Sequence, residues 1–256
     1  MHVVAIHSLD KDKETLAGAL SATLEVTIFE ALQRLRAPGD GPLIVAVFAE
    51  RNPAVQLVVR LQSAGFNSSI LTAEEIEAEG GARIVRRFSL GELELAGATE
   101  KGDSFSIPFH DIDLILRGTS ISSDSATETI KNRSVSLGRA VLSGGVMITK
   151  TTKSVHEVTV EERQGFVNLY SVAGSTLVFR ENAIVYDSLG PALRPSRAAN
   201  FICLIAELRR RCPGALYDER LLSKAGQVAL LGPSLNPERY LVVATALLAK
   251  VFRGKN

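Results

Sequence analysis

The chain has 256 residues, a length at which a hydrophobic core forms without disulfides or metal ions. Its 29 basic and 28 acidic side chains nearly cancel, which argues against nucleic-acid binding, because that affinity comes largely from neutralising phosphates. The N-terminus lacks the basic start and long apolar stretch of a signal peptide, and the apolar runs are far shorter than the roughly 20 residues of a membrane-spanning helix. We therefore expect a cytoplasmic protein that binds no nucleic acid.

Residues 1–72 alternate between short apolar runs and stretches with helical spacing. Runs rich in β-branched residues predict three strands, over residues 3–6, 43–49 and 66–71. Thr27 and Glu30 have the spacing of a capping box, so a helix should begin there. Asn52-Pro53 combines a cap residue with a proline at the first helical position, which predicts another helix start. Together with a helix over residues 11–24, the expected order is βααβαβ.

The last helix of this module carries the packing pattern of a known family. Its apolar positions are Ala54, Leu57, Leu61 and Ala64-Gly65, and the preceding helix holds the pair Glu30-Ala31. With these residues, residues 1–72 resemble the C-terminal domain of ribosomal protein L7/L12. The resemblance implies the same fold and a module that docks other proteins.

The turn before the second helix is the candidate partner surface. The L7/L12 family binds translation factors through a basic helical face with a Gly-Leu-Gly-Leu-Lys turn. Here the turn reads Glu25-Val26-Thr27-Ile28-Phe29, and Lys13 is the clear basic residue in front of it. Phe29 and Leu32 either pack in the core or are exposed where the family has lysines, where they would form an apolar patch for a protein partner.

Residues 73–82 form a linker or short acidic helix, and after them the apolar period changes from 3.6 to 2. Short strands separated by turn residues predict that residues 83–212 form an antiparallel sheet or small barrel closed by a helix over residues 196–211. The strand pattern Ile107-Pro108-Phe109-His110-Asp111-Ile112 is similar to that of bacterial pleckstrin-homology-type domains. This resemblance implies a fold and no ligand.

Residues 118–153 would be a long connection rich in Ser, Thr and Gly, and connections of this length tend to be functional or mobile. Lys150-Thr151 ends the segment like a phosphate-binding loop, but Thr149 stands where that motif requires glycine. The part over residues 139–153 is apolar with basic edges, which is typical of a loop that touches a membrane surface or a partner. The candidate contact residues are Arg139, Val141, Leu142, Val146, Met147, Lys150 and Lys153.

Residues 213–256 predict a helical tail. One helix should begin at Asp218, and another after the cap Asn236-Pro237. The second is apolar nearly all round, so it should be buried against the sheet or a second subunit.

The residues that carry chemistry are scattered. His2, His7, His110 and His156 stand singly, and His110-Asp111 would point to opposite faces of a strand. Cys203 and Cys212 should lie on opposite faces of one helix. We therefore expect no cofactor, no metal ion and no catalytic residue.

These patterns together predict an α+β protein with domains over residues 1–72, 83–212 and 213–256. The whole chain is also similar to a group of bacterial proteins to which no activity is assigned. The leading hypothesis is a non-catalytic adaptor or scaffold that binds a protein partner. The sequence is also compatible with a homo-oligomer. The alternatives are a peripheral membrane or lipid-binding protein acting through residues 139–153, and an enzyme with a dispersed active site.

Overall fold

The computed structural model describes residues 1–9, 12–35, 41–135 and 149–254, and the side chains among them outside residues 122–161. The chain is α+β, and it divides into two compact units. The first unit combines Met1–Ser120 with Gln164–Asn256, and the second is Ile121–Arg163, which contains parts of two strands.

The N-terminal part of the first unit forms an antiparallel sheet with the strand order β2-β1-β3. Strand β1 lies in the middle, where His2 pairs with Phe48 on one side and with Thr72 on the other. The elements in chain order are β1 (His2–His7), α1 (Lys13–Leu24), α2 (Ile28–Leu35), β2 (Leu43–Phe48), α3 (Arg51–Ser63) and β3 (Asn67–Thr72).

Local signals predicted two of the helix starts, and one of the two is confirmed. The expected capping box is confirmed, because the Thr27 amide donates to Glu30 Oε2 at 2.9 Å and the Glu30 amide donates to Thr27 Oγ1 at 3.2 Å. The predicted cap at Asn52 is wrong, because α3 begins at Arg51, one residue after Glu50. The helix ends before Gly65, whose φ of +85° suits glycine.

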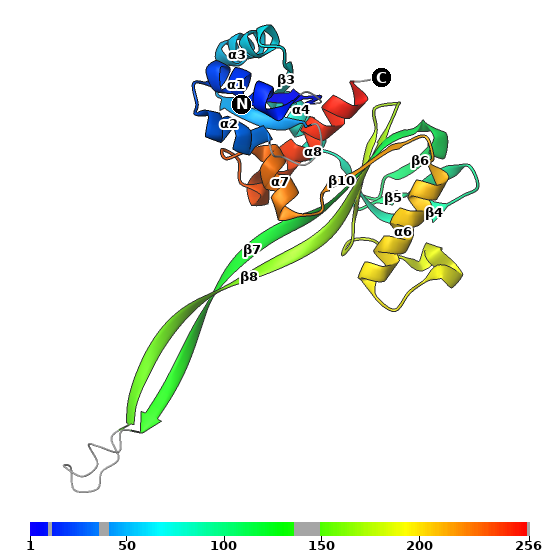
Figure 1. The fold of residues 1–256 in the computed structure, drawn as a ribbon. Helices are drawn as coiled ribbons and strands as arrows, with labels where there is room; N and C mark the ends of the chain where they lie inside the picture. Colours follow the sequence, from blue (N-terminus) through cyan, green and yellow to red (C-terminus); the bar gives the residue numbers. More distant parts are fainter. Residues whose placement is uncertain (10–11, 36–40, 136–148, 255–256) are drawn as a thin grey trace, which may run out of the picture. The chain divides into compact units, whose positions relative to one another are not determined.

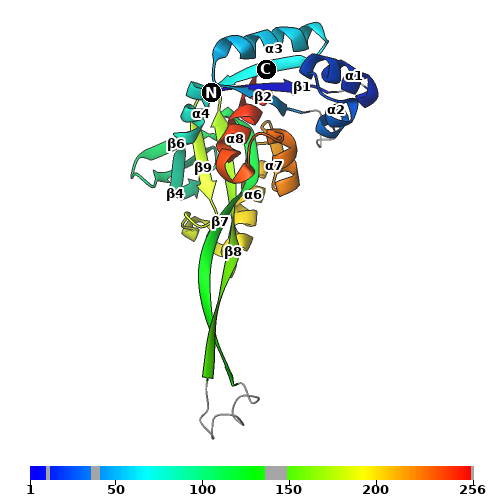
Figure 2. The same ribbon diagram turned by 90° about the vertical axis from the view of Figure 1, so that its left-hand side faces the viewer.

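Both faces of the three-stranded sheet are covered by helices (Figures 1 and 2). Val4 and Ile6 of β1 pack with α1, α2 and α3, whereas Val3 and Ala5 pack with α7 (Lys224–Leu231) and α8 (Pro237–Arg253). Successive side chains of a strand point to opposite faces. The continuous apolar run of β1 therefore follows from its position between two helical layers.

The rest of the first unit is built on a second sheet, with the order β10-β7-β8-β9-β4-β5-β6 in the described part of the chain. Its strands are β4 (Arg83–Leu90), β5 (Glu94–Thr99), β6 (Ser104–Pro108), β7 (Ile112–Val135), β8 (Thr149–Ser171), β9 (Thr176–Arg180) and β10 (Leu216–Leu221). The sheet is mixed, because β10 runs parallel to β7 and β4 runs parallel to β9. The alternative of a small barrel is wrong, since the sheet is open between β10 and β6.

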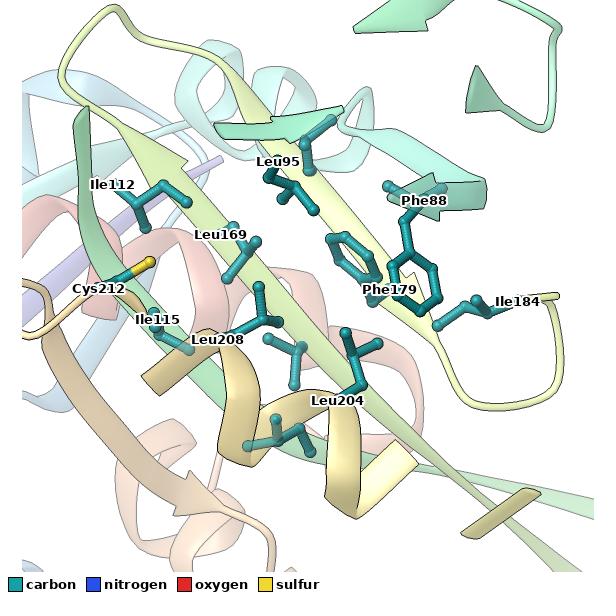
Figure 3. Close-up of a cluster of buried hydrophobic side chains, with 14 of the residues drawn as sticks. Phe88, Leu95, Ile112, Ile115, Leu169, Phe179, Ile184, Leu204, Leu208 and Cys212 are labelled. Carbon is teal, nitrogen blue, oxygen red and sulfur yellow. The ribbon is translucent and has the colours of Figure 1, made fainter. Parts of the chain in front are cut away.

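Helix α6 (Arg197–Arg211) covers one face of this sheet. Ser196 caps the helix by accepting from the Ala199 amide at 3.2 Å. Leu204 and Leu208 are fully buried against Leu169 and Phe179 of the sheet (Figure 3). Burial on this scale is the main source of stability in a layered domain. Ile202 on the outer side of α6 is 57% exposed.

Two of the predicted segments differ from the structure, and a third is confirmed in one of its two alternatives. The supposed connection over residues 118–153 is largely strand, because β7 extends to Val135 and β8 begins at Thr149. Of the two alternatives for residues 73–82, the short acidic helix is confirmed, because they contain helix α4 (Ala73–Gly80) with its own capping box between Thr72 and Glu75. The supposed helical tail contains strand β10, and α7 begins at Lys224 rather than at Asp218. The domain boundaries at residues 72, 83 and 212 stay predictions.

Candidate functional site

The first turn of α2 exposes two large apolar side chains. Phe29 is 68% exposed and Ile28 is 59% exposed, because the buried face of this short helix is formed by Ala31 and Leu35. Leu32 is partly buried and packs against the core of the N-terminal module. The two candidate residues therefore have different environments: Phe29 is exposed at the surface, whereas Leu32 packs against the core.

Phe29 borders an apolar groove of about 370 Å³ between α2, β2 and α7. The groove is lined by Phe29, Glu30, Gln33, Arg34, Leu43, Ile44, Val228, Ala229, Gly232 and Pro233. Val228 on α7 is 46% exposed and extends the apolar surface beyond Phe29 and Ile28. The pKa of Glu30 is lowered by the backbone and side chain of Thr27, so a carboxylate stays charged beside Phe29.

A second feature is a group of hydrogen-bonded side chains between α4 and β8. Tyr170 donates its hydroxyl proton to Glu79 Oε1 at 2.6 Å, and Asn168 Nδ2 donates to the same oxygen at 3.0 Å. Burial raises the pKa of Glu79, although the hydrogen bonds from Tyr170, Thr245 and Asn168 oppose that shift. Burial and the Glu79 carboxyl raise the pKa of Tyr170 well above 10, so this phenol stays protonated.

These residues border a pocket of about 430 Å³, which we call the Asn168 pocket. Its lining residues are Glu79, Gly80, Ala82, Ile84, Ser120, Gln164, Phe166, Asn168, Val178, Arg180, Leu241, Val242 and Thr245. Asn168 is only 5% exposed, and its Oδ1 has no hydrogen-bond partner. Most buried polar atoms in folded proteins have such a partner, so this oxygen needs an explanation.

Arg253, near the end of α8, forms hydrogen bonds with two strands next to the pocket. Arg253 Nε donates to Asp113 Oδ2 at 2.8 Å, and its Nη2 donates to the Ser171 carbonyl at 2.7 Å. The same guanidinium lies 5.9 Å from the ring centroid of Tyr170. Contacts from one arginine to two strands hold Tyr170, and through it Glu79, in place.

The histidines and cysteines do not form a reactive group where the structure describes them. Cys203 and Cys212 are both free thiols, and burial raises the pKa of Cys212 to about 11, so this thiol stays protonated. His110 and Asp111 lie in a short 3₁₀ turn, where Nε2 of the histidine comes within 3.3 Å of Asp111 Oδ1. The prediction that these neighbours point apart is therefore wrong, because they are not in a strand. Among the described residues no cluster of three His, Cys, Asp or Glu side chains could hold a metal ion.

The structure does not describe the side chains of the candidate residues for a membrane or partner loop, so it does not test that prediction. Arg139, Val141, Leu142, Val146 and Met147 fall in residues 136–148, outside the described part of the chain. Lys150 and Lys153 belong to strand β8, for which only the backbone is described at those positions. In the described ranges, no single helix has the length and apolarity to cross a bilayer.

Comparisons with known proteins add no relative. The chain matches no protein-family model, no curated protein and no solved structure. Its function must therefore be argued from its own side chains.

The Asn168 pocket was not predicted from the sequence, although a weak signal is present there. Asn168 and Tyr170 are two residues apart beside Phe166, Val167 and Leu169 of β8, a spacing that places both on one face. Glu79 gave no signal of its own, because it ends an acidic stretch that resembles an ordinary solvated helix.

Proposed function

We propose that the protein is an adaptor, which docks a partner protein on the apolar groove between α2 and α7. The observation that carries the proposal is the 68% exposure of Phe29 beside an apolar groove. A large aromatic side chain at the surface is costly to leave in water and is a common anchor of protein interfaces. The occupant is a short apolar segment of another protein, because the groove has room for only a few side chains.

Resemblance to the L7/L12 domain supports the same face. The chain order β1-α1-α2-β2-α3-β3 supports this inference. The L7/L12 family docks its partners next to the turn before the second helix. At this turn the present chain has Ile28 and Phe29 where the family has a basic face. We infer a partner that offers apolar rather than acidic side chains. For residues 83–212, the packing of α6 against a sheet supports a pleckstrin-homology-like arrangement at the level of fold, with no ligand attached to it.

The expected strength of the anchor follows from its exposed area. Burying a phenylalanine completely contributes about 1.5–3 kcal/mol, so covering the exposed two thirds of Phe29 should contribute about 1–2 kcal/mol. Since 1.4 kcal/mol corresponds to a factor of ten, Phe29→Ser should weaken partner binding roughly five- to thirtyfold. The variant should leave stability nearly unchanged because the side chain is already in water.

Photo-crosslinking in the native cell tests this function. A benzoylphenylalanine at position 29 should give one discrete cross-linked product that contains another protein. The matched control places the same group at Leu93, which is 80% exposed on a different surface and should not give that product. Val228→Glu in the same groove should abolish the product, since it puts a charge among the apolar contacts.

A peptide from the cross-linked segment should then bind the purified protein, and Phe29→Ser should weaken it by the factor given above. Equal background labelling from positions 29 and 93 would refute the docking face. A product that contains only a second copy of this chain would replace the adaptor function with self-association.

A further inference from the structure

We propose that the Asn168 pocket binds a small primary amine with an apolar body. The starting point is Asn168, which is 5% exposed and whose Oδ1 accepts no hydrogen bond. Leaving a buried carbonyl oxygen without a donor costs free energy, and a ligand that donates there removes that cost. The pocket is a separate site from the α2–α7 groove, so this inference does not depend on the adaptor function.

The orientation of the Asn168 amide is set by its neighbour. Nδ2 donates to Glu79 Oε1 at 3.0 Å, and the Tyr170 hydroxyl donates to the same oxygen at 2.6 Å. Turning the amide over would bring its Oδ1 against a carboxylate oxygen, which repels it. Oδ1 therefore remains the free acceptor, and the ligand must supply the donor.

An ammonium group fits the acceptors around this point. Glu79, Asn168 and Thr245 all line the pocket, and they offer a carboxylate, an amide oxygen and a hydroxyl. A primary ammonium has three donors, one for each of these acceptors. A charge that enters a partly buried site needs a counter-charge, and the Glu79 carboxylate provides it.

The remaining lining selects an apolar body behind the amine. Ile84, Phe166, Val178 and Leu241 come from β4, β8, β9 and α8 and line the same pocket. Its volume of about 430 Å³ lies within the usual size of small-molecule sites, which runs from about 300 to 1,000 Å³. An aromatic or branched aliphatic amine of modest size meets both requirements.

Titration of the full-length protein with phenethylamine tests the proposal, with binding followed by ligand-detected NMR and calorimetry. The comparison ligand is 3-phenylpropanoate, which has the same apolar body but carries an acceptor in place of the ammonium. We expect saturable binding of the amine and at least tenfold weaker binding of the acid. Asn168→Leu and Glu79→Gln should each weaken the amine at least tenfold.

The matched control is Gln62→Leu, which makes the same amide-to-leucine change at an exposed position of α3 outside the pocket lining and should keep the affinity within threefold. If Asn168→Leu does not fold, Thr245→Val removes one acceptor with little change of shape and should weaken the amine by about threefold or more. The proposal is overturned if the folded protein shows no saturable binding of phenethylamine. It is equally overturned if both ligands bind alike, or if the folded acceptor variants bind the amine as the unmodified protein does.

Discussion

Replacing Leu247 with alanine should strongly destabilise the N-terminal sheet, although the residue lies near the other end of the chain. Leu247 is fully buried in α8 and shares a cluster with Val3, Ile44 and Leu71 of the three strands. The substitution removes three carbon atoms, which at about 0.8 kcal/mol each gives about 2.4 kcal/mol of lost transfer free energy. The cavity left behind should raise the loss to about 3–4 kcal/mol, because a packed layer closes only partly around it.

Urea unfolding followed by far-ultraviolet circular dichroism measures this loss, and the chain contains no Trp to serve as a fluorescent probe. Val228→Ala on α7 is the control, because Val228 is 46% exposed and its truncation should cost less than about 1 kcal/mol. Hydrogen exchange should show reduced protection of the β1 amides in Leu247→Ala. Equal unfolding midpoints for the two variants, or unchanged protection of β1, would show that α8 is not part of the core of that sheet.

Three further predictions concern single contacts. Thr27→Ala removes the capping box with Glu30 and should destabilise α2 by about 1 kcal/mol, seen as faster amide exchange confined to that helix. Gly97→Ala should lower the free energy of unfolding in urea by about 3 kcal/mol, because the added Cβ would collide with the Arg87 carbonyl oxygen and lie 2.8 Å from Phe105 Cζ. A decrease of less than about 1 kcal/mol would contradict this close packing. Burial raises the pKa of Glu79 in the folded state. The free energy of unfolding of the unmodified protein, relative to that of Glu79→Gln, should therefore be greatest below pH 4.5 and fall as the pH rises through the folded-state pKa. A difference that does not depend on pH would contradict the burial of this carboxyl.

Features set by neighbouring residues could be predicted from the sequence. The capping box of Thr27 and Glu30 and the cap formed by Asn236 are confirmed, since each depends only on side chains within three residues of a helix start. The buried stripe of α3 is likewise confirmed at Ala54, Leu57 and Leu61. These features could be predicted because their geometry depends on residues close in sequence, although the Asn52-Pro53 signal did not mark the start of α3.

Features set by distant residues could not be predicted in the same way. Leu216–Leu221 has a weak strand pattern, and it becomes β10 because Leu216 and Tyr217 pair with Leu114 and Ile115 about a hundred positions earlier. Tertiary pairing of this kind overrides a weak local preference. The hydrogen-bonded group of Glu79, Asn168 and Tyr170 likewise joins residues that are far apart in the sequence, because Glu79 lies on α4 and the other two on β8. The spacing of neighbouring residues therefore does not predict the complete group.

The apolar character of α8 has a double cause, which the sequence alone does not separate. Val243 and Leu247 belong to the core cluster that includes residues of the three-stranded sheet, whereas Leu241 and Thr245 line the Asn168 pocket. One side of the helix is therefore required for folding, and the other is available for a ligand. Substitutions at Val243 or Leu247 report on stability, and any loss of amine binding they cause follows the folded fraction. A substitution at Thr245 that lowers amine affinity without moving the unfolding midpoint would instead come from the pocket itself, and this difference separates a binding role from a packing role within a single helix.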